Sequence, residues 1–190
     1  MAADRPVLTF ADAAEAEAWF ETHHADTDGL WVVIARKGSD VATPTIDEML
    51  DIALAYGWID GQRRRRDDAT YLQTYVPRRR RSPWSQINRD KVAALTTAGR
   101  MRPAGLAEVE RAKADGRWDN ATASPSTFEV PADFLAALGQ NPEAKAFFDG
   151  AGRQNAFRVY YQLLQARRPE TRQRRIETYV AMFARGERLA

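Results

Sequence analysis

Two runs of four arginines occupy residues 63–66 and 78–81, and they bracket a short segment that contains two tyrosines and a glutamine. The whole chain holds 28 Lys and Arg against 26 Asp and Glu, so its formal net charge is only +2 and the arginine charge is concentrated rather than spread. Guanidinium groups bind phosphate and carboxylate oxygens through a planar fork of N–H donors. The pattern therefore predicts an anionic partner, and nothing in it identifies a reaction.

Charge is segregated along the chain. Residues 60–90 hold nine Arg against four Asp, residues 153–190 hold nine Arg against three Glu, and the rest holds ten basic and nineteen acidic residues. Such basic strips attract anions over a Debye length of about 8 Å at physiological salt. Two alternatives remain open: the arginines are solvated faces without a partner, or they pair with the acidic part of another copy and form a homo-oligomer.

Other chemistry has no visible basis in the sequence. There is no cysteine, so thiol chemistry and disulfides are excluded. His23 and His24 are adjacent, and neighbours on a helix point about 100° apart, which makes a poor metal pair. No glycine-rich phosphate loop or nucleophile motif is present. We expect no metal, no cofactor and no catalytic residue, and a binding module rather than an enzyme.

The segment from Trp58 to Pro77 predicts a β-hairpin that turns near residues 67–70. If the turn is centred on Asp68 and Ala69, Gln62 faces Tyr75 and Arg64 faces Gln73. Side chains alternate between the two faces of a strand, so each arginine run places about two residues on each face. One face would carry Ile59, Leu72, Thr74 and Val76 and pack on the helices.

The other face mixes aromatic rings, amides, arginines and one carboxylate, which is unusual for a plain solvent face. We expect ligand-binding side chains there and at the start of the following helix. We also expect neighbouring arginines to lower the pKa of Asp60, which suits ion pairing better than general-base catalysis. The candidate ligand-binding residues are Trp58, Asp60, Gln62, Arg64, Gln73, Tyr75, Arg79, Trp84 and Asn88.

Two functions fit these candidates. In the first, a nucleic acid or another extended anion lies along the hairpin, and aromatic rings between the arginine runs offer stacking surfaces. In the second, the polar face is partly enclosed under the C-terminal helices and forms a small-molecule pocket that could be enzymatic. Asp60→Ala combined with Gln73→Ala would mark a site if ligand binding were lost without a loss of stability.

The elements that position the hairpin can be predicted from caps and apolar periods. Thr9-Phe10-Ala11-Asp12 resembles a capping box, with a helix to about Glu21. Residues 30–35 form a continuous apolar run typical of a central strand. Thr45-Ile46-Asp47-Glu48 is a second capping box, and its helix ends at Gly57. Ser82-Pro83 predicts a helix start with Ser82 as N-cap, running to Gly99.

Prolines 103, 131 and 142 each predict the start of a short helix, and apolar residues recur at helical spacing after residue 153. Residues 121–128 are rich in Ser, Thr and Pro and predict a linker. We therefore expect an α+β domain at 7–120 and a helical domain at 129–188. The fold class is α+β: an N-terminal half of order α-β-α-β-β with a small antiparallel sheet, then an all-helical C-terminal half.

No run of apolar residues approaches the 18 needed to span a membrane, and Met1-Ala2-Ala3-Asp4-Arg5-Pro6 lacks the pattern of an export signal. A cytoplasmic protein is the expectation.

Several segments together resemble a known bacterial family. They are Tyr56-Gly57-Trp58-Ile59-Asp60-Gly61-Gln62, Tyr71-Leu72-Gln73, Pro77-Arg78-Arg79, Ser82-Pro83-Trp84-Ser85-Gln86-Ile87-Asn88, Gly99-Arg100-Met101, Ala104-Gly105-Leu106 and Ala166-Arg167-Arg168-Pro169-Glu170-Thr171-Arg172. The chain resembles the YdeI/OmpD-associated family, often labelled bacteriocin-protection, from about residue 7 to 188. The resemblance implies a stress-related interaction protein that protects against cationic peptides in the periplasm, and it supplies no catalytic residue. The basic strips would repel cationic peptides, which favours the cytoplasmic expectation.

Overall fold

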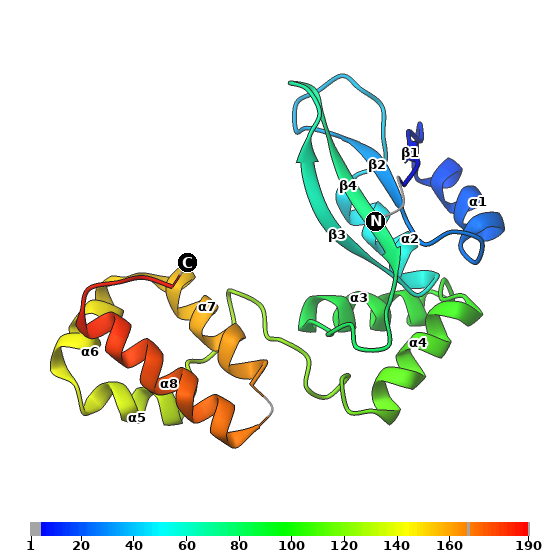
Figure 1. The fold of residues 1–190 in the computed structure, drawn as a ribbon. Coiled ribbons are helices and arrows are strands. Elements are labelled where there is room, and N and C mark those ends of the chain that lie inside the picture. The colour runs from blue at the N-terminus through cyan, green and yellow to red at the C-terminus, as the bar shows by residue number, and fades with distance from the viewer. Residues whose placement is uncertain (1–4, 167, 190) are drawn as a thin grey trace. The chain divides into compact units, whose positions relative to one another are not determined.

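The computed structural model describes residues 5–166 and 168–189. The expectation about an export signal concerns residues 1–4, which lie outside the described residues, as does residue 167 of the last family-like segment. The chain forms two compact units that divide between Ala121 and Thr122. The first unit holds the sheet and the second is helical, which confirms the predicted α+β class (Figure 1).

The first unit contains a four-stranded sheet in the order β1-β2-β4-β3. Its strands are β1 (Val7–Leu8), β2 (Leu30–Ala35), β3 (Trp58–Arg65) and β4 (Thr70–Pro77). The three longer strands are antiparallel, as predicted, and β2 and β4 are the inner strands. The sequence did not reveal β1, which pairs in parallel with β2, because two residues are too short to show a strand period.

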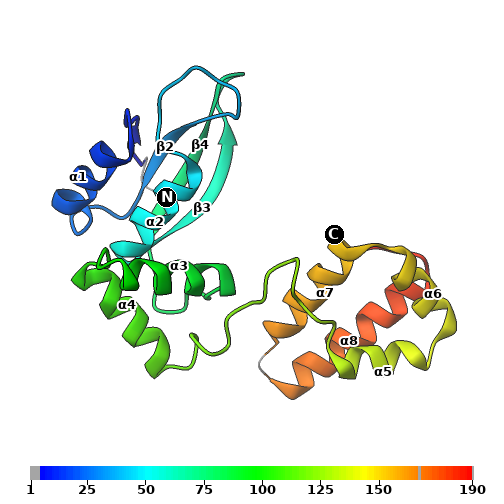
Figure 2. The same cartoon turned by 180° about the vertical axis from the view of Figure 1, so that it is seen from behind.

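Helices α1 (Ala13–His23) and α2 (Ile46–Ala55) cover one face of this sheet. Figures 1 and 2 view the molecule from opposite sides, and both show α2 next to the sheet. Phe20 of α1 and Met49 of α2 are fully buried in one cluster with β2 and β4 side chains. Burial of these apolar surfaces is the main force that holds the hairpin in place.

The helix starts follow local hydrogen bonds. At α2 the predicted capping box is confirmed, since Thr45 accepts from the Glu48 amide and Glu48 accepts from the Thr45 amide. Before α1 the predicted Thr9 cap is wrong: Asp12 accepts from the Glu15 amide at 2.9 Å, and Glu15 reaches back to the Ala11 amide. Asp12 is therefore the N-cap of α1, and the Glu15 carboxylate three residues later accepts from an amide next to the cap.

Helices α3 (Gln86–Thr97) and α4 (Pro103–Ala114) complete the first unit. The predicted N-cap Ser82 is wrong, because Ser85 caps α3 and the Ser82 hydroxyl accepts from the Arg79 amide instead. Gly105 brings α4 against the end of α2; a Cβ placed there would lie 2.1 Å from the Ala55 carbonyl oxygen. Only glycine permits this close approach.

The second unit packs α5 (Ala132–Gly139), α6 (Pro142–Gly150), α7 (Arg153–Leu164) and α8 (Pro169–Ala184) around a core of its own. Most of the predicted linker belongs to this unit: Arg153 donates to the carbonyls of Pro125 and Ser126, and the Ala123 amide donates to Tyr160. Among the described residues, no helix has both the length and the apolar character needed to cross a membrane.

Candidate functional site

A β-bulge in the hairpin decides which side chains share a face. Trp58, Ile59 and Asp60 pair with Pro77, Val76 and Tyr75, whereas Arg63, Arg64 and Arg65 pair with Gln73, Leu72 and Tyr71. The register shifts by one between Asp60 and Arg63. The assumed uniform register, in which Gln62 faces Tyr75 and Arg64 faces Gln73, is therefore wrong. A bulge adds one residue to one strand and exchanges the faces of every residue beyond it.

The bulge is held by two side chains of β4. Gln73 donates to the carbonyls of Gly61 and Gln62 at 3.0 and 3.3 Å, and Thr74 donates to the carbonyl of Gln62 at 3.2 Å. Arg63 completes the arrangement by donating to the Gln73 amide oxygen at 3.2 Å. The carbonyl groups that the bulge removes from the ladder thus find partners, as buried backbone polar groups require.

The expected assignment of faces is inverted. Tyr71, Gln73 and Tyr75 face the same side as Leu30, Val32 and Ile34, and this side packs on α1 and α2. The other side carries Trp31, Thr74 and Arg64. Aromatic rings look amphipathic in a sequence but bury large apolar areas, and the Gln73 amide is satisfied internally, so the face that reads as polar is the core face.

Four of the nine candidate residues have almost no exposed surface. Trp58 is 1% exposed and donates its indole N–H to the carbonyl of His24. Gln73 is 2% exposed and is used by the bulge, Tyr75 is fully buried, and Trp84 is 2% exposed beneath Arg78. These side chains build the unit and do not present a surface to a ligand. Trp58 and Tyr75 pack under α1 and α2, and Trp84 belongs to a second cluster with Val92 and Leu95 of α3.

The other five candidates keep solvent contact but do not form one site. Asp60, Gln62, Arg64 and Arg79 are exposed and Asn88 is half-buried. Asp60 and Arg64 point to opposite faces of the sheet. The backbone N–H of Asn88 donates to the capping hydroxyl of Ser85, which places this residue in the first turn of α3.

Asp60 and Tyr75 face each other across β3 and β4. Burial raises the pKa of Asp60, although Arg78 and Arg63 act in the opposite direction. The expected lowering of this pKa is therefore wrong, and water at the exposed side of the residue reduces the shift. Burial also raises the pKa of the Tyr75 hydroxyl, which finds no hydrogen-bond partner among the described residues. Burial therefore favours the neutral form of both groups.

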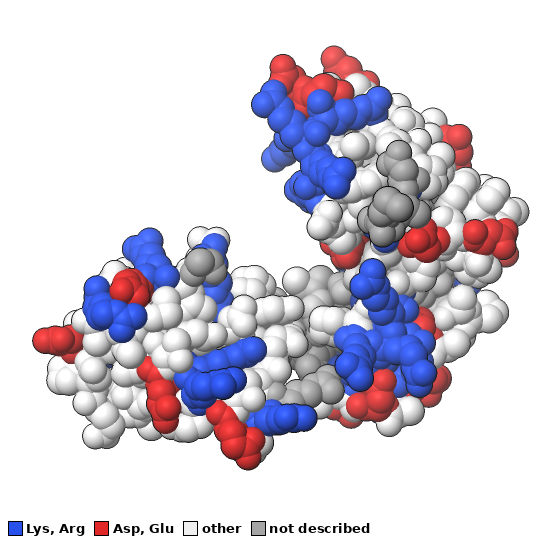
Figure 3. All heavy atoms as spheres, in the orientation of Figure 1, with Lys and Arg blue, Asp and Glu red and all other residues white. Residues whose placement is uncertain are grey.

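The tip of the hairpin carries exposed cationic groups. Arg64 lies over the ring of Trp31 at 4.5 Å, and Arg63 lies over Tyr71 at 4.3 Å. Arg65 and Arg66 each pair with a turn aspartate, Asp68 and Asp67. Figure 3 shows Lys and Arg gathered at this tip, with a second group over the segment that follows β4.

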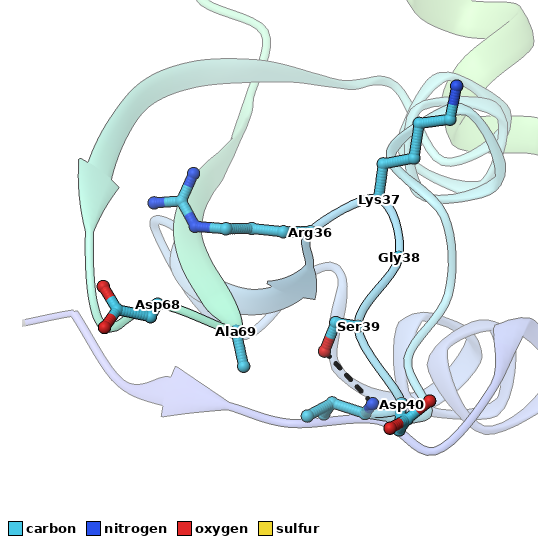
Figure 4. A pocket seen from close by; sticks show the side chains of 8 residues that line it. Arg36, Lys37, Gly38, Ser39, Asp40, Asp68 and Ala69 are labelled. Carbon is cyan, nitrogen blue, oxygen red and sulfur yellow. Dashed lines mark hydrogen bonds between the residues drawn. The ribbon is translucent and has the colours of Figure 1, made fainter.

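Beside the tip lies an open hollow of about 590 Å³, lined by the loop after β2 and by Asp68 and Ala69 of the turn. Figure 4 shows Arg36 extending toward the turn while Lys37 points away. The Arg36 guanidinium donates to the carbonyl of Asp67 at 3.4 Å. Sequence analysis missed both cations, and a Lys or Arg directly after a buried strand was the available signal.

The second arginine run divides into one buried and three exposed residues. Arg78 is 5% exposed and stacks on Trp84, whereas Arg79, Arg80 and Arg81 are exposed. Among the described residues, no carboxylate lies within 4.0 Å of these three guanidinium groups. Groups of three or more His, Cys, Asp or Glu that could hold a metal ion are absent from the same described residues.

Comparisons with known proteins give one family match in each of the two compact units. Residues 8–108 match the Domain of unknown function (DUF8412), and residues 127–186 match the family described as Bacteriocin-protection, YdeI or OmpD-Associated. No curated protein and no solved structure matches the chain. The predicted resemblance to the YdeI/OmpD-associated family is confirmed over residues 127–186. Most of the sequence segments that suggested this resemblance lie within residues 8–108, which match DUF8412. The chain belongs to the DUF8412 family by the match over its first unit, and residues 127–186 of its second unit are similar to the YdeI/OmpD-associated family.

Proposed function

We propose that the protein is a non-enzymatic module that binds an extended anionic ligand, a nucleic acid, through the exposed arginines at the two ends of the β3–β4 hairpin. The observation that carries this proposal is the state of Arg79, Arg80 and Arg81. They are consecutive and exposed, and no described carboxylate pairs with them. Three unpaired cations in a row favour a ligand with several negative charges.

The spacing of the two cationic groups supports a polymer rather than a small anion. β4 has eight residues between the tip and the second arginine run, which corresponds to roughly 26 Å at about 3.3 Å per residue. One strand of a nucleic acid duplex presents a phosphate about every 3.4 Å along the axis. A single phosphate cannot reach both groups, whereas about eight successive phosphates span them.

The structure changes how such a ligand would be recognised. Trp58, Gln73 and Tyr75 are buried, so they offer no edge or ring to a base. Arg64 covers Trp31, which is 8% exposed. Contacts to phosphates without contacts to bases give affinity but little sequence preference. We therefore propose binding that depends on charge and is largely independent of sequence.

A second proposed function follows from the family description of residues 127–186. In this alternative the protein acts in bacteriocin protection, as the name of that family says, and it does so by binding a partner. Charge complementarity with another copy would give a homo-oligomer. Light scattering of the full chain at low and high salt tests that form, and a monomer in both conditions contradicts it. We further propose a cytoplasmic location for either function.

The proposed nucleic-acid binding is tested with the purified full chain and fluorescent oligonucleotides. Single-stranded and double-stranded DNA of several unrelated sequences are titrated at increasing salt. We expect similar affinities for unrelated sequences and a steep loss of affinity with added salt, because released counterions drive the association. If no salt-sensitive binding to single- or double-stranded oligonucleotides is observed, the proposal is wrong.

A further inference from the structure

Two buried arginines of the first unit bind neighbouring backbone carbonyls, those of Ser82 and Pro83. Arg78 and Arg117 are each 5% exposed. Arg117 donates from Nη1 to the carbonyl of Ser82 at 2.9 Å, and Arg78 donates from Nη1 to the carbonyl of Pro83 at 3.1 Å. Because these two carbonyls are consecutive, the two guanidinium groups flank the same short stretch. We call Arg78 and Arg117 the buried arginine pair.

Each member of the buried arginine pair has N–H groups to spare. Nε and Nη2 of Arg78 and Nη2 of Arg117 have no acceptor among the described residues, although almost no water reaches them. The indole N–H of the neighbouring Trp84 is also buried and without a partner. Buried donors normally find acceptors, and a charged donor left without one is costly.

The charges around the pair do not supply the missing acceptors. Asp115 binds Arg117 through Nε at 2.8 Å to each carboxylate oxygen, which leaves Nη2 free. Glu108 pairs with Arg111, and Arg111 also donates to the carbonyl of Arg78. Burial lowers the pKa of Arg78 to about 10; the charge of Arg117 acts in the same direction, and the charges of Glu108 and Asp60 oppose it. The Arg78 guanidinium is still protonated at neutral pH, so the surplus donors are cationic.

The Trp84 ring limits the orientation of the Arg78 guanidinium. The Arg78 guanidinium lies 3.7 Å from the centre of the Trp84 ring, and Trp84 meets Trp118 edge to face at 4.9 Å. A guanidinium held flat on a ring keeps its donor edges in a fixed plane. Such a preorganised fork matches a planar pair of acceptor oxygens better than a mobile side chain does.

We infer that the buried arginine pair, with Trp84 beneath it, is a binding site for a tetrahedral oxyanion of the phosphate class. The oxyanion would accept the spare N–H groups of both guanidiniums and replace contacts that the protein itself does not supply. This inference goes beyond the proposed polymer surface, because Arg78 and Arg117 are buried whereas that surface uses exposed arginines.

An anion can reach the pair only if atoms next to it move. The turn at residues 79–82 leads directly into the Ser82 and Pro83 carbonyls, and it is closed by the Ser82 amide, which donates to the Arg79 carbonyl at 2.9 Å. Displacing this turn would uncover the guanidinium groups. Its three unpaired arginines would raise the local concentration of anions at the entrance.

The experiment uses the full chain and inorganic phosphate as the probe. Isothermal titration should give one phosphate per chain, and phosphate should raise the melting temperature more than chloride at equal ionic strength. Arg78→Lys and Arg117→Lys keep the charge but lose the fork, so each should weaken phosphate binding at least about tenfold. The matched control Arg80→Lys lies in the exposed turn and should leave the affinity within about twofold.

The phosphate titration of the wild-type protein tests the inference even if the lysine variants do not fold. Absence of stoichiometric phosphate binding, or an equal effect of phosphate and chloride, overturns the inference. An equal loss in the Arg80→Lys control also overturns it, because the exposed turn would then be the binding element.

Competition separates the possible sources of the phosphate. If phosphate displaces a 5′-phosphorylated oligonucleotide but not its unphosphorylated form, the pair receives a nucleic-acid end. If phosphate binds without displacing either oligonucleotide, the pair receives a small phosphate compound. Both results support the site. Phosphate binding without any oligonucleotide binding would contradict the proposed function alone, and the converse would contradict this inference alone.

Discussion

Arg63 and Gln73 face each other across β3 and β4, and the Arg63 Nε donates a hydrogen bond of 3.2 Å to the Gln73 amide oxygen. The same amide donates to the two carbonyls of the bulge. Gln73 therefore sets the position of each arginine beyond the bulge. Arg64 lies on the side of Trp31 for this reason, and Arg63 lies on the side of Tyr71.

Gln73→Ala should destabilise the first unit. The change leaves the carbonyl of Gly61 and the Arg63 N–H without their partner, at a cost of about 1–3 kcal/mol, and the carbonyl of Gln62 keeps only its hydrogen bond from Thr74. The free energy of unfolding is measured by urea denaturation. Gln62→Ala is the control, since Gln62 is exposed and only its carbonyl takes part in the bulge; it should change stability by less than about 0.5 kcal/mol. Equal stability of the two variants would contradict this account of the bulge.

Local signals were sufficient for most of the elements of the first unit. The apolar run of β2 and the capping box of α2 are properties of a few neighbouring residues, and both were predicted. The bulge depends on Gln73 and Thr74 reaching across to another strand, so the register could not be read from either strand alone. Gly61, an isolated glycine within a strand pattern, was the one available sign of a bulge.

The site was harder to predict than the fold. Nothing in the sequence distinguishes Arg78 from the three arginines that follow it. Its burial depends on Trp84, on α4 and on the residues that follow α4. Arg117 lies far along the chain and belongs to no run of charges. The sequence suggests aromatic residues as ligand-stacking surfaces, but Trp58 and Tyr75 lie in the core, where their large apolar areas are buried.

Asp60→Asn should increase stability at neutral pH. The pKa of Asp60 is raised from its ordinary value of 3.8 by burial, so the folded state favours the neutral carboxyl and its ionised form weakens the fold above the raised pKa. The advantage of the asparagine should disappear as the pH falls to the ordinary value and both forms become neutral. Urea denaturation at neutral and acidic pH measures the difference. A variant less stable than the wild type at neutral pH would show that Arg63 and Arg78 outweigh the burial.

Asp133→Asn should show the opposite pH dependence in the second unit. Arg172 donates to both oxygens of Asp133 at 2.6 and 2.9 Å and lowers the pKa of that carboxyl from 3.8. The stabilisation is therefore fully present above the ordinary value and is lost as the pH falls through the lowered one. Because the Asp133 side chain is 45% exposed, we expect a loss of only about 0.2–1 kcal/mol at neutral pH.

Arg172→Gln removes the same pair and is the companion variant. It should lose a similar amount of stability at neutral pH, with a correspondingly weaker dependence on acid. A loss for Asp133→Asn that persists unchanged in strong acid would mean that the carboxylate charge is not what stabilises this contact.

The salt dependence of oligonucleotide binding tests the central claim most directly. The wild type is compared with a variant in which Arg79, Arg80 and Arg81 are changed to Gln, and with a control in which the exposed Arg174 and Arg188 of the second unit are changed to Gln. For a single strand, each phosphate contact contributes about 0.7 to the slope of log K against log salt. We predict that the slope of the triple variant is smaller by about two, and that the control keeps the wild-type slope. A triple variant with the wild-type slope and affinity would contradict the account.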